Sequence, residues 1–213
     1  MTKRIAILAA LVAVALTLAG CGFKPPVQWN ETEERARALE AMNGWAQGVE
    51  DYNIDAMAGD GILAAGFRLT IKEGSAKPYD KPVTDLLREL RDDEDNQLAF
   101  RKSKAEGGAG YELAFDVDWE IDKINKSSAT VLGVFEVWET MEGGLGADVP
   151  GHIVDGWWNS DNGTIEVALV RTPNAWKITY MKIVFNAGVG AAARSLSGSV
   201  GLRIGKLPSM LGW

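Results

Sequence analysis

Residues 111–122 read Tyr-Glu-Leu-Ala-Phe-Asp-Val-Asp-Trp-Glu-Ile-Asp, and this stretch decides the fold class. Every second residue from Leu113 to Ile121 is apolar, and most of the residues between them are acidic. Successive side chains of a β-strand point to opposite faces. The alternation therefore predicts a strand with one buried face and one acidic, solvent-facing side, as antiparallel sheets commonly have.

The same kind of pattern continues toward the C-terminus. A turn at 125–128 precedes the second strand, Asp161-Asn162-Gly163 is a typical hairpin sequence, and 172–175 forms another turn. The segment from residue 111 onward is therefore expected to be a meander of antiparallel strands. Beyond the first strand, the expected strands cover 129–140, 153–159, 164–171 and 176–185.

The segment before residue 111 is mainly helical. Apolar residues recur at three- and four-residue steps over 31–52, which predicts a long amphipathic helix, and a short helix is expected after Asn53. A strand at 67–72 precedes a third helix through Leu86 and Leu90. That helix is expected to end before the acidic run 92–95, because acids at a helix C-terminus oppose the helix dipole.

Helices followed by a meander predict an α+β fold, with the helices packed on one face of a curved, mainly antiparallel sheet. This order over 31–185, with Trp45-Ala46-Gln47-Gly48-Val49-Glu50-Asp51-Tyr52-Asn53-Ile54-Asp55-Ala56-Met57 at its opening helices, resembles the cone fold of nuclear transport factor two. The resemblance extends to ketosteroid isomerase, scytalone dehydratase and polyketide cyclases. It implies an enzyme of the isomerase or dehydratase type as one function. No residue matches the motifs of those enzymes closely enough to carry a role over.

The N-terminus has the three parts of a secretory signal: Lys3 and Arg4, an apolar run, and a small-residue exit. Its last four residues, Leu18-Ala19-Gly20-Cys21, resemble the bacterial lipobox. The resemblance implies cleavage after Gly20, diacylglycerol and further acylation (palmitate) at Cys21, and a membrane anchor. Gly22 would fit sorting to the outer membrane, facing the periplasm, in a Gram-negative host. An uncleaved membrane helix is the rival, since nineteen uncharged residues separate Arg4 from Lys24.

Four parts are thus expected: a signal peptide at 1–20, a lipidated tether at 21–30, the cone-like domain at 31–185, and a Gly-rich extension at 186–213. Removing Lys3 and Arg4 leaves 20 basic against 29 acidic residues. Such an acidic chain argues against nucleic acid as a partner. The extension holds Arg194, Arg203 and Lys206 and no acid.

No catalytic residue, metal site or cofactor is expected. Gly188-Val189-Gly190-Ala191-Ala192-Ala193 fits a dinucleotide fingerprint only formally, because no acidic residue or βαβ unit follows it. The only cysteine is Cys21 and the only histidine is His152, which disfavours zinc. An acidic ladder on the first strand could hold a hard cation, but a solvated sheet face is the preferred interpretation. Its members are Asp116, Asp118, Glu120 and Asp122.

Candidate binding residues are His152, Trp157 and Trp158. His152 lies in a loop and could act as a general base, with an exposed loop histidine as the plain alternative. Adjacent strand residues point to opposite faces, so one of the two tryptophans is free for a ligand, a partner or the membrane interface, unless it packs under the C-terminal extension. Strands 132–138 and 177–185 are apolar on both faces. We expect the extension or a second copy of the chain to cover their outer face.

The function expected from sequence is therefore a lipid-anchored, extracytoplasmic binding or accessory module of the cell envelope. Its expected partners are the membrane through the lipid anchor, an envelope protein or a small apolar ligand, and a second copy of the chain. The alternatives are an isomerase- or dehydratase-type enzyme with a cone pocket, and a structural subunit of an envelope complex. The cationic extension is expected to pack on its own sheet, with anionic lipid or cell-wall polymer as the alternative contact.

The anchor can be checked by the intact mass of the chain purified from bacterial membranes. We expect the mass of 21–213 plus acyl chains, because the lipobox directs both acylation and cleavage. A Cys21→Ala form should lose the acyl mass. An uncleaved mass with membrane retention of both forms would establish the membrane helix instead.

Overall fold

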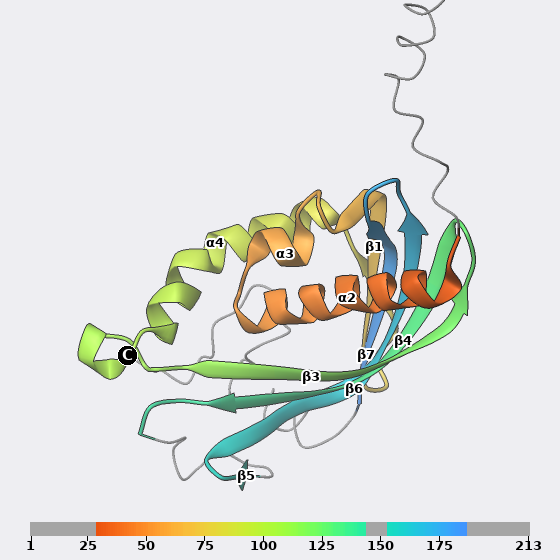
Figure 1. The fold of residues 1–213 in the computed structure, drawn as a ribbon. Helices are drawn as coiled ribbons and strands as arrows, with labels where there is room; N and C mark the ends of the chain where they lie inside the picture. The colour runs from red at the N-terminus through yellow and green to blue at the C-terminus, as the bar shows by residue number, and fades with distance from the viewer. Residues whose placement is uncertain (1–28, 144–152, 187–213) are drawn as a thin grey trace, which may run out of the picture. The chain divides into compact units, whose positions relative to one another are not determined.

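A computed structural model describes residues 29–143 and 153–186 of the chain. Three helices, α2 (Glu31–Glu50), α3 (Ile54–Ala58) and α4 (Val83–Arg101), lie on one side of a single sheet (Figure 1). A short 3-10 turn, η1, covers Lys104–Glu106. The strands are β1 (Leu63–Glu73), β2 (Tyr79–Lys81), β3 (Glu112–Ile124), β4 (Ser128–Thr140), β5 (Ile153–Val154), β6 (Trp157–Arg171) and β7 (Trp176–Phe185).

The seven-stranded sheet has the order β2-β1-β7-β6-β4-β3, and β5 pairs with β6 beside this path. All pairs are antiparallel except β1 with β7, which run parallel. The long strands bend around α2 in Figure 1. The predicted α+β class, with helices on one face of a curved and mainly antiparallel sheet, is confirmed.

The alternation in β3 places its side chains as the sequence predicts. Leu113 and Phe115 are buried, whereas Asp116 and Asp118 are exposed. Aromatic rings from several strands then continue the interior. Phe135 lies 5.5 Å from both Phe115 and Phe185 between ring centroids. Such contacts add about 0.5–1.5 kcal/mol per pair to the stabilisation from burial, so these rings form the centre of the core.

Helix α2 covers this core with the predicted apolar stripe. Met42 and Trp45 are buried, and Trp45 meets the Phe115 ring edge-on at 5.8 Å. The two glycines of the helix differ in role. A Cβ on Gly48 would lie 2.7 Å from Cβ of Ala56, so Gly48 allows α3 to approach closely. A Cβ on Gly44 would meet nothing within 4 Å, so packing requires a glycine only at position 48.

The acidic run 92–95 is helical, and the prediction of a loop there was wrong. Helix α4 continues to Arg101, so the acids lie in its middle and a basic residue occupies its last turn. Asp93 is buried and accepts a hydrogen bond of 2.8 Å from Gln97 Nε2, one turn further along. The opposition between acids and the helix dipole acts only near the helix end.

The predicted hairpin at Asp161-Asn162-Gly163 was also wrong, because β6 runs through all three residues. The tight turn of this region lies earlier, at Asp155 and Gly156, whose φ angles of 50° and 85° connect β5 to β6. Gly163 is required by packing instead. A Cβ there would lie 2.0 Å from the carbonyl oxygen of Val184 and 2.9 Å from the Phe135 ring.

Gly163→Ala should therefore destabilise the protein. The added methyl group would clash with a backbone carbonyl and a core ring, and overpacking of this kind costs about 1–3 kcal/mol. Urea denaturation measures the free energy of unfolding. Gly44→Ala is the control, and it should be neutral or stabilising, by up to about 1 kcal/mol, because its methyl group meets open space on a helix. Equal stability of Gly163→Ala and the unsubstituted protein would contradict the packing role.

Candidate functional site

Two polar clusters with a buried acid lie at opposite ends of α2. The first joins the start of the helix to the sheet through Glu34. The Glu34 carboxylate accepts hydrogen bonds from Arg171 Nε at 3.0 Å and Nη2 at 2.6 Å, and from Trp176 Nε1 at 3.0 Å. Arg171 lowers the pKa of Glu34 more strongly than burial raises it, so the acid is charged. Each buried oxygen of this cluster has a partner, which marks it as structural.

A hollow of about 340 Å³ lies beside this link, lined by Arg37, Glu40 and the 172–175 turn among others. Arg37 and Glu40 are exposed, and the Glu34 carboxylate is already occupied by Arg171 and Trp176. Nothing in this hollow requires a ligand to complete a hydrogen bond. We therefore place the candidate functional site at the other end of α2.

The second cluster consists of Arg101, Tyr111, Glu139 and Ser160, called here the Glu139 cluster. Glu139 faces inward on β4, opposite Leu113 of β3 and Trp158 of β6. Tyr111 precedes β3, and Arg101 ends α4, with its guanidinium 5.5 Å from the centre of the Tyr111 ring. The Arg101 Nη1 atom also donates a hydrogen bond to the backbone carbonyl of Glu50, the last residue of α2.

Burial controls the acid–base properties of this cluster. Glu139 is 1 % exposed, and burial raises its pKa to about 7. The nearby hydroxyls of Ser160 and Tyr111 favour the carboxylate and offset this rise only in part, although the Tyr111 hydroxyl makes no hydrogen bond of standard geometry with it. The charge of Asp161 adds to the rise. Burial and the neighbouring Glu139 raise the pKa of Tyr111 well above its ordinary value. Glu139 can therefore gain or lose a proton near neutral pH, whereas Tyr111 keeps its proton.

Several polar atoms of the Glu139 cluster are buried without a hydrogen-bond partner among the described residues. They are Arg101 Nε, the Tyr111 hydroxyl and Glu139 Oε1. The indole nitrogen of Trp119, on β3, is in the same condition. Each such atom costs about 1–3 kcal/mol, and the large majority of buried polar atoms in proteins are paired. The cluster therefore stands out from the apolar interior as the place where a further group would be stabilising.

The residues singled out from sequence have separate positions. Trp158 is buried at 3 % exposure beside Glu139, and Trp157 is half-buried on the other side of β6. The structure thus confirms that the two tryptophans face opposite sides, while their predicted binding role stays a prediction. His152 and the lipidation site at Gly20 and Cys21 lie outside the described residues.

Sequence reasoning missed Glu139, although a signal for it exists. Val131, Phe135 and Val137 occupy the buried face of β4 at two-residue steps, and the next step is Glu139. An acidic residue at a position of the strand that should be apolar is unusual, and such buried acids often mark a binding or catalytic site. Arg101 was missed for a different reason. The helix that carries it, α4, was predicted to end several residues earlier.

The parts of the chain that the structure describes hold no group of three or more His, Cys, Asp and Glu residues arranged to bind a metal ion. Over the same ranges, no helix combines the length and apolar character needed to cross a membrane.

The chain matches no family model, and no curated protein is similar to it in sequence. Solved structures are similar in fold. The β subunit of a predicted aromatic-ring-hydroxylating dioxygenase from Novosphingobium aromaticivorans has a TM-score of 0.51 at 7 % identity, covering 74 % of this chain and 94 % of that one. The protein Kfla4162 from Kribbella flavida has a TM-score of 0.50 at 18 % identity, covering 78 % and 99 %.

A third similar structure is an NTF2-like protein with a cystatin-like fold from Novosphingobium aromaticivorans, with a TM-score of 0.46 and 13 % identity. It covers 78 % of this chain and 89 % of its own. Identities this low show the fold alone. The fold of the described residues, with helices on one face of a curved and mainly antiparallel sheet, is thus shared with the dioxygenase β subunit and Kfla4162.

The raised pKa of Glu139 predicts a pH-dependent stability. The folded state binds the Glu139 proton more tightly than the unfolded state does, so stability is greatest below pH 4.5 and is lost as pH rises to about 7. Because one pKa unit corresponds to about 1.4 kcal/mol, this contribution is on the order of 3 kcal/mol. Glu139→Gln should remove this pH dependence. Because the variant carries no buried charge at high pH, it should be more stable than the unsubstituted chain at pH 8.

Denaturation at pH 5 and pH 8 measures this difference. Glu136→Gln is the matched control, since Glu136 lies on the same strand but is exposed on the other face. Glu34 titrates below its ordinary pKa and leaves this window unaffected. The assignment is wrong if Glu139→Gln and Glu136→Gln change with pH in the same way.

Proposed function

We propose that this chain is a lipid-anchored, extracytoplasmic protein whose cone binds a small molecule at the Glu139 cluster without transforming it. The expected ligand is largely apolar and carries a carbonyl or carboxylate oxygen. The observation that carries this proposal is the set of buried, unpartnered polar atoms on Arg101, Tyr111 and Glu139.

The chemistry of these atoms defines the polar part of the ligand. Arg101 Nε carries a hydrogen and can only donate, and the Tyr111 hydroxyl keeps its proton because its pKa is raised. Below pH 7 Glu139 is mainly protonated and is a further donor. All three groups can thus donate a hydrogen bond, which favours a ligand oxygen with free lone pairs. Hydrogen bonds that involve a charged group contribute about 1.5–3 kcal/mol.

The surroundings define the apolar part of the ligand. The Phe100 ring lies 5.1 Å from the Tyr111 ring, and the buried indole of Trp158 is opposite Glu139. Phe100 and Arg101 are only half-buried, so the cluster approaches the surface at the end of α4. A flat or aliphatic ligand body would pack against these rings, as ligand sites commonly combine apolar walls with few polar groups.

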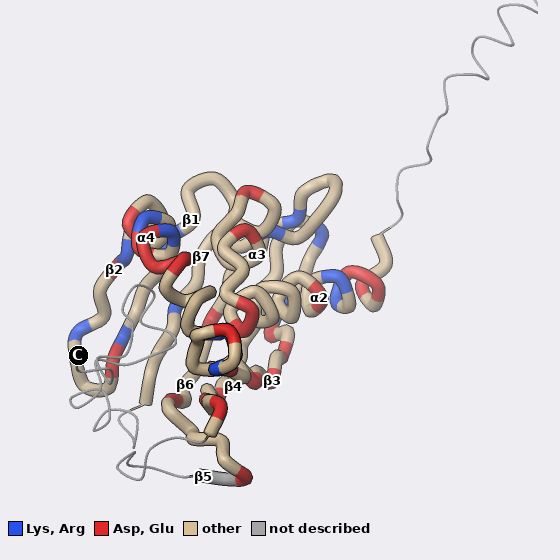
Figure 2. The backbone as a smooth tube through the Cα atoms, turned by 90° about the vertical axis from the view of Figure 1, so that its left-hand side faces the viewer, with Lys and Arg blue, Asp and Glu red and all other residues tan. Residues whose placement is uncertain are grey.

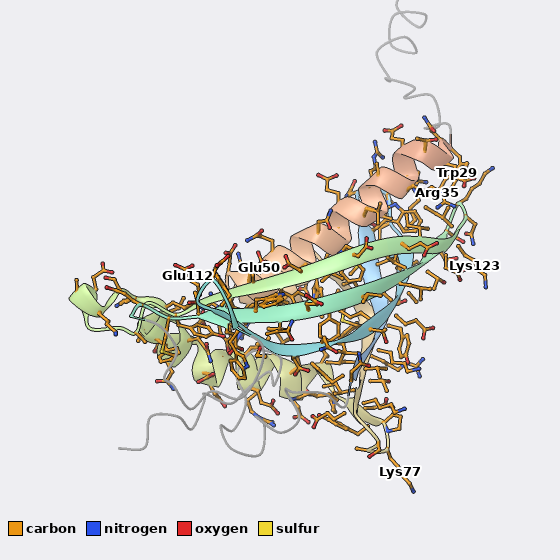
Figure 3. All side chains as sticks on the ribbon, turned by 90° about the horizontal axis from the view of Figure 1, so that it is seen from below. Trp29, Arg35, Glu50, Lys77, Glu112 and Lys123 are labelled. Atoms are coloured by element: carbon orange, nitrogen blue, oxygen red, sulfur yellow. The ribbon has the colours of Figure 1, made fainter. Side chains whose placement is uncertain are left out.

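The Glu139 cluster lies toward one end of the domain. Figure 3 shows Arg35 and Lys123 at one end of the domain and Glu50 and Glu112 at the other. The cluster lies near the end of α2, about 30 Å from the start of this helix of 20 residues.

An acid–base enzyme is the second candidate, and the pKa of Glu139 favours it. A carboxyl group that titrates near pH 7 can accept and return a proton at working pH, which a general acid–base catalyst requires. An uncharged Tyr111 beside it could stabilise a developing negative charge on a carbonyl oxygen. Proton exchange at the α-carbon of a bound ketone, followed by NMR in D₂O, separates this candidate from simple binding. Exchange that is lost in Glu139→Gln would establish the enzyme.

Tyr111→Phe gives the sharpest test of the binding site. The substitution removes a hydroxyl that has no hydrogen bond among the described residues, so the free protein should be as stable as before or slightly more stable. The affinity for a ligand found by thermal-shift screening of aromatic carboxylates and ketones should fall about tenfold, which corresponds to about 1.4 kcal/mol. Opposite effects on stability and affinity distinguish a ligand contact from a structural one.

Tyr180→Phe is the control, because Tyr180 lies under Arg68 on the outer face of the sheet. It should leave the affinity unchanged. Should Tyr111→Phe bind as tightly as the unsubstituted chain, the ligand would not contact the hydroxyl and this site would be wrong. If no compound of either class shifts the melting temperature, the proposed ligand chemistry is wrong.

A further inference from the structure

The outer face of the sheet carries an apolar centre that the described residues leave uncovered. Leu132 is 41 % exposed and Val134 is 63 % exposed, both on β4. Beside them, on β6 and β7, Thr164 and Val184 are directly paired. These four side chains border a hollow of about 380 Å³. We call this surface the outer groove, and its position is independent of the Glu139 cluster, which lies inside the cone.

The outer groove is bordered by negative charge. Asp118 and Glu120 of β3 and Glu166 of β6 are among its lining residues. The acidic row on β3 is visible in Figure 2. Lys182 is the cation among the lining residues, and it lies 3.9 Å from Glu166. An occupant of this groove should therefore be apolar and positively charged.

The C-terminal extension has this composition. Residues 187–213 contain Arg194, Arg203 and Lys206 and no acid. Their large apolar residues are Leu196, Val200, Leu202, Ile204, Leu207, Met210, Leu211 and Trp213. A cationic, apolar segment that starts where the last strand ends is thus complementary to the outer groove in both charge and polarity.

The start of the extension lies beside the groove. Asn186 follows β7 and bonds to Asn162 of β6, from backbone nitrogen to carbonyl oxygen at 3.0 Å and between the side chains at 2.9 Å. Asn162 lies two residues before Thr164, which lines the groove. Only a few residues of extended chain, at about 3.3 Å each, are needed to reach Val134 from there.

A second copy of the chain is the competing occupant, and two physical arguments disfavour it. Binding of a tethered segment is intramolecular, with an effective concentration in the millimolar range for short linkers, whereas a second copy must be recruited from solution. In addition, each copy without residues 1–20 carries 29 acidic and 20 basic residues, so two acidic domains repel each other.

We propose that residues 187–213 bind in the outer groove of their own domain, with apolar side chains on Leu132 and Val134 and basic side chains beside Asp118 and Glu120. The segment then covers the apolar outer face that would otherwise bind other chains. Its contribution weakens as salt rises, because the charges at the rim are exposed and screened.

Single-cysteine labelling tests this proposal. The chain 21–213 with Cys21→Ser contains no other cysteine, so Val134→Cys introduces a unique thiol on the exposed strand position. Its reaction with a disulfide reagent is compared with that of the same variant ending at Asn186. We expect the thiol to react at least tenfold more slowly in the longer chain. Arg88→Cys, whose native side chain is 63 % exposed on α4, is the control and should react equally fast in both.

Charge reversal and dilution complete the experiment. Asp118→Lys with Glu120→Lys in the longer chain should raise the labelling rate toward that of the shortened one. Fast labelling in both chains would mean that the outer groove is bare, and would overturn the proposal. Slow labelling in both, relieved by dilution, would assign the groove to a second copy of the chain and would equally overturn it. None of these results depends on ligand binding at Tyr111 or Glu139.

Discussion

The position of α2 depends on one ion pair, between the buried Glu34 and the half-buried Arg171. Glu34 lies in the first turn of the helix, where a negative charge is also favourable for the helix dipole. Arg171 ends β6 and Trp176 begins β7, so one carboxylate holds the helix to two adjacent strands. Removing Arg171 would leave the Glu34 carboxylate buried with its charge uncompensated, which is strongly destabilising.

The far end of α2 is fixed by different contacts. The Glu50 side chain accepts a hydrogen bond of 2.8 Å from the backbone nitrogen of Phe115, and its carbonyl accepts one from Arg101. A helix held at both ends can close the cone over the aromatic core without sliding along the sheet. The Glu139 cluster therefore lies between rigid elements, which a preorganised ligand site needs.

Local patterns in the sequence predicted most of the fold where polarity follows burial. The alternation in 111–122 and the helical stripe around Met42 and Trp45 both reflect one buried face, and both were correct. Asp161-Asn162-Gly163 was misread as a turn, because the need for glycine comes from Phe135 and Val184, which are distant in sequence. The acidic run 92–95 was misread because the extent of α4 is set by Asp93, Gln97 and the basic last turn.

The candidate site could be predicted only in part for a related reason. An acid at an inward position of β4 is visible in the sequence, but its raised pKa depends on burial by elements that come together only in the fold. Arg101, Tyr111 and Glu139 are brought together by a helix end and two strands, with no fixed spacing between them. The prediction that Trp157 and Trp158 face opposite sides of their strand was correct, because that property follows from strand geometry alone.

The parallel pairing of β1 with β7 has a consequence for how the chain folds. The two strands are the only long parallel pair in the described sheet, and Ile71 of β1 lies opposite Ile183 of β7, more than a hundred residues away. β1 therefore cannot complete its pairing until β7, the last described strand, has been synthesised. Such non-local pairing slows folding. During synthesis, the edge of β1 that pairs with β7 stays unpaired until the chain has been made through Phe185, so the nascent chain exposes an open sheet edge for most of its synthesis.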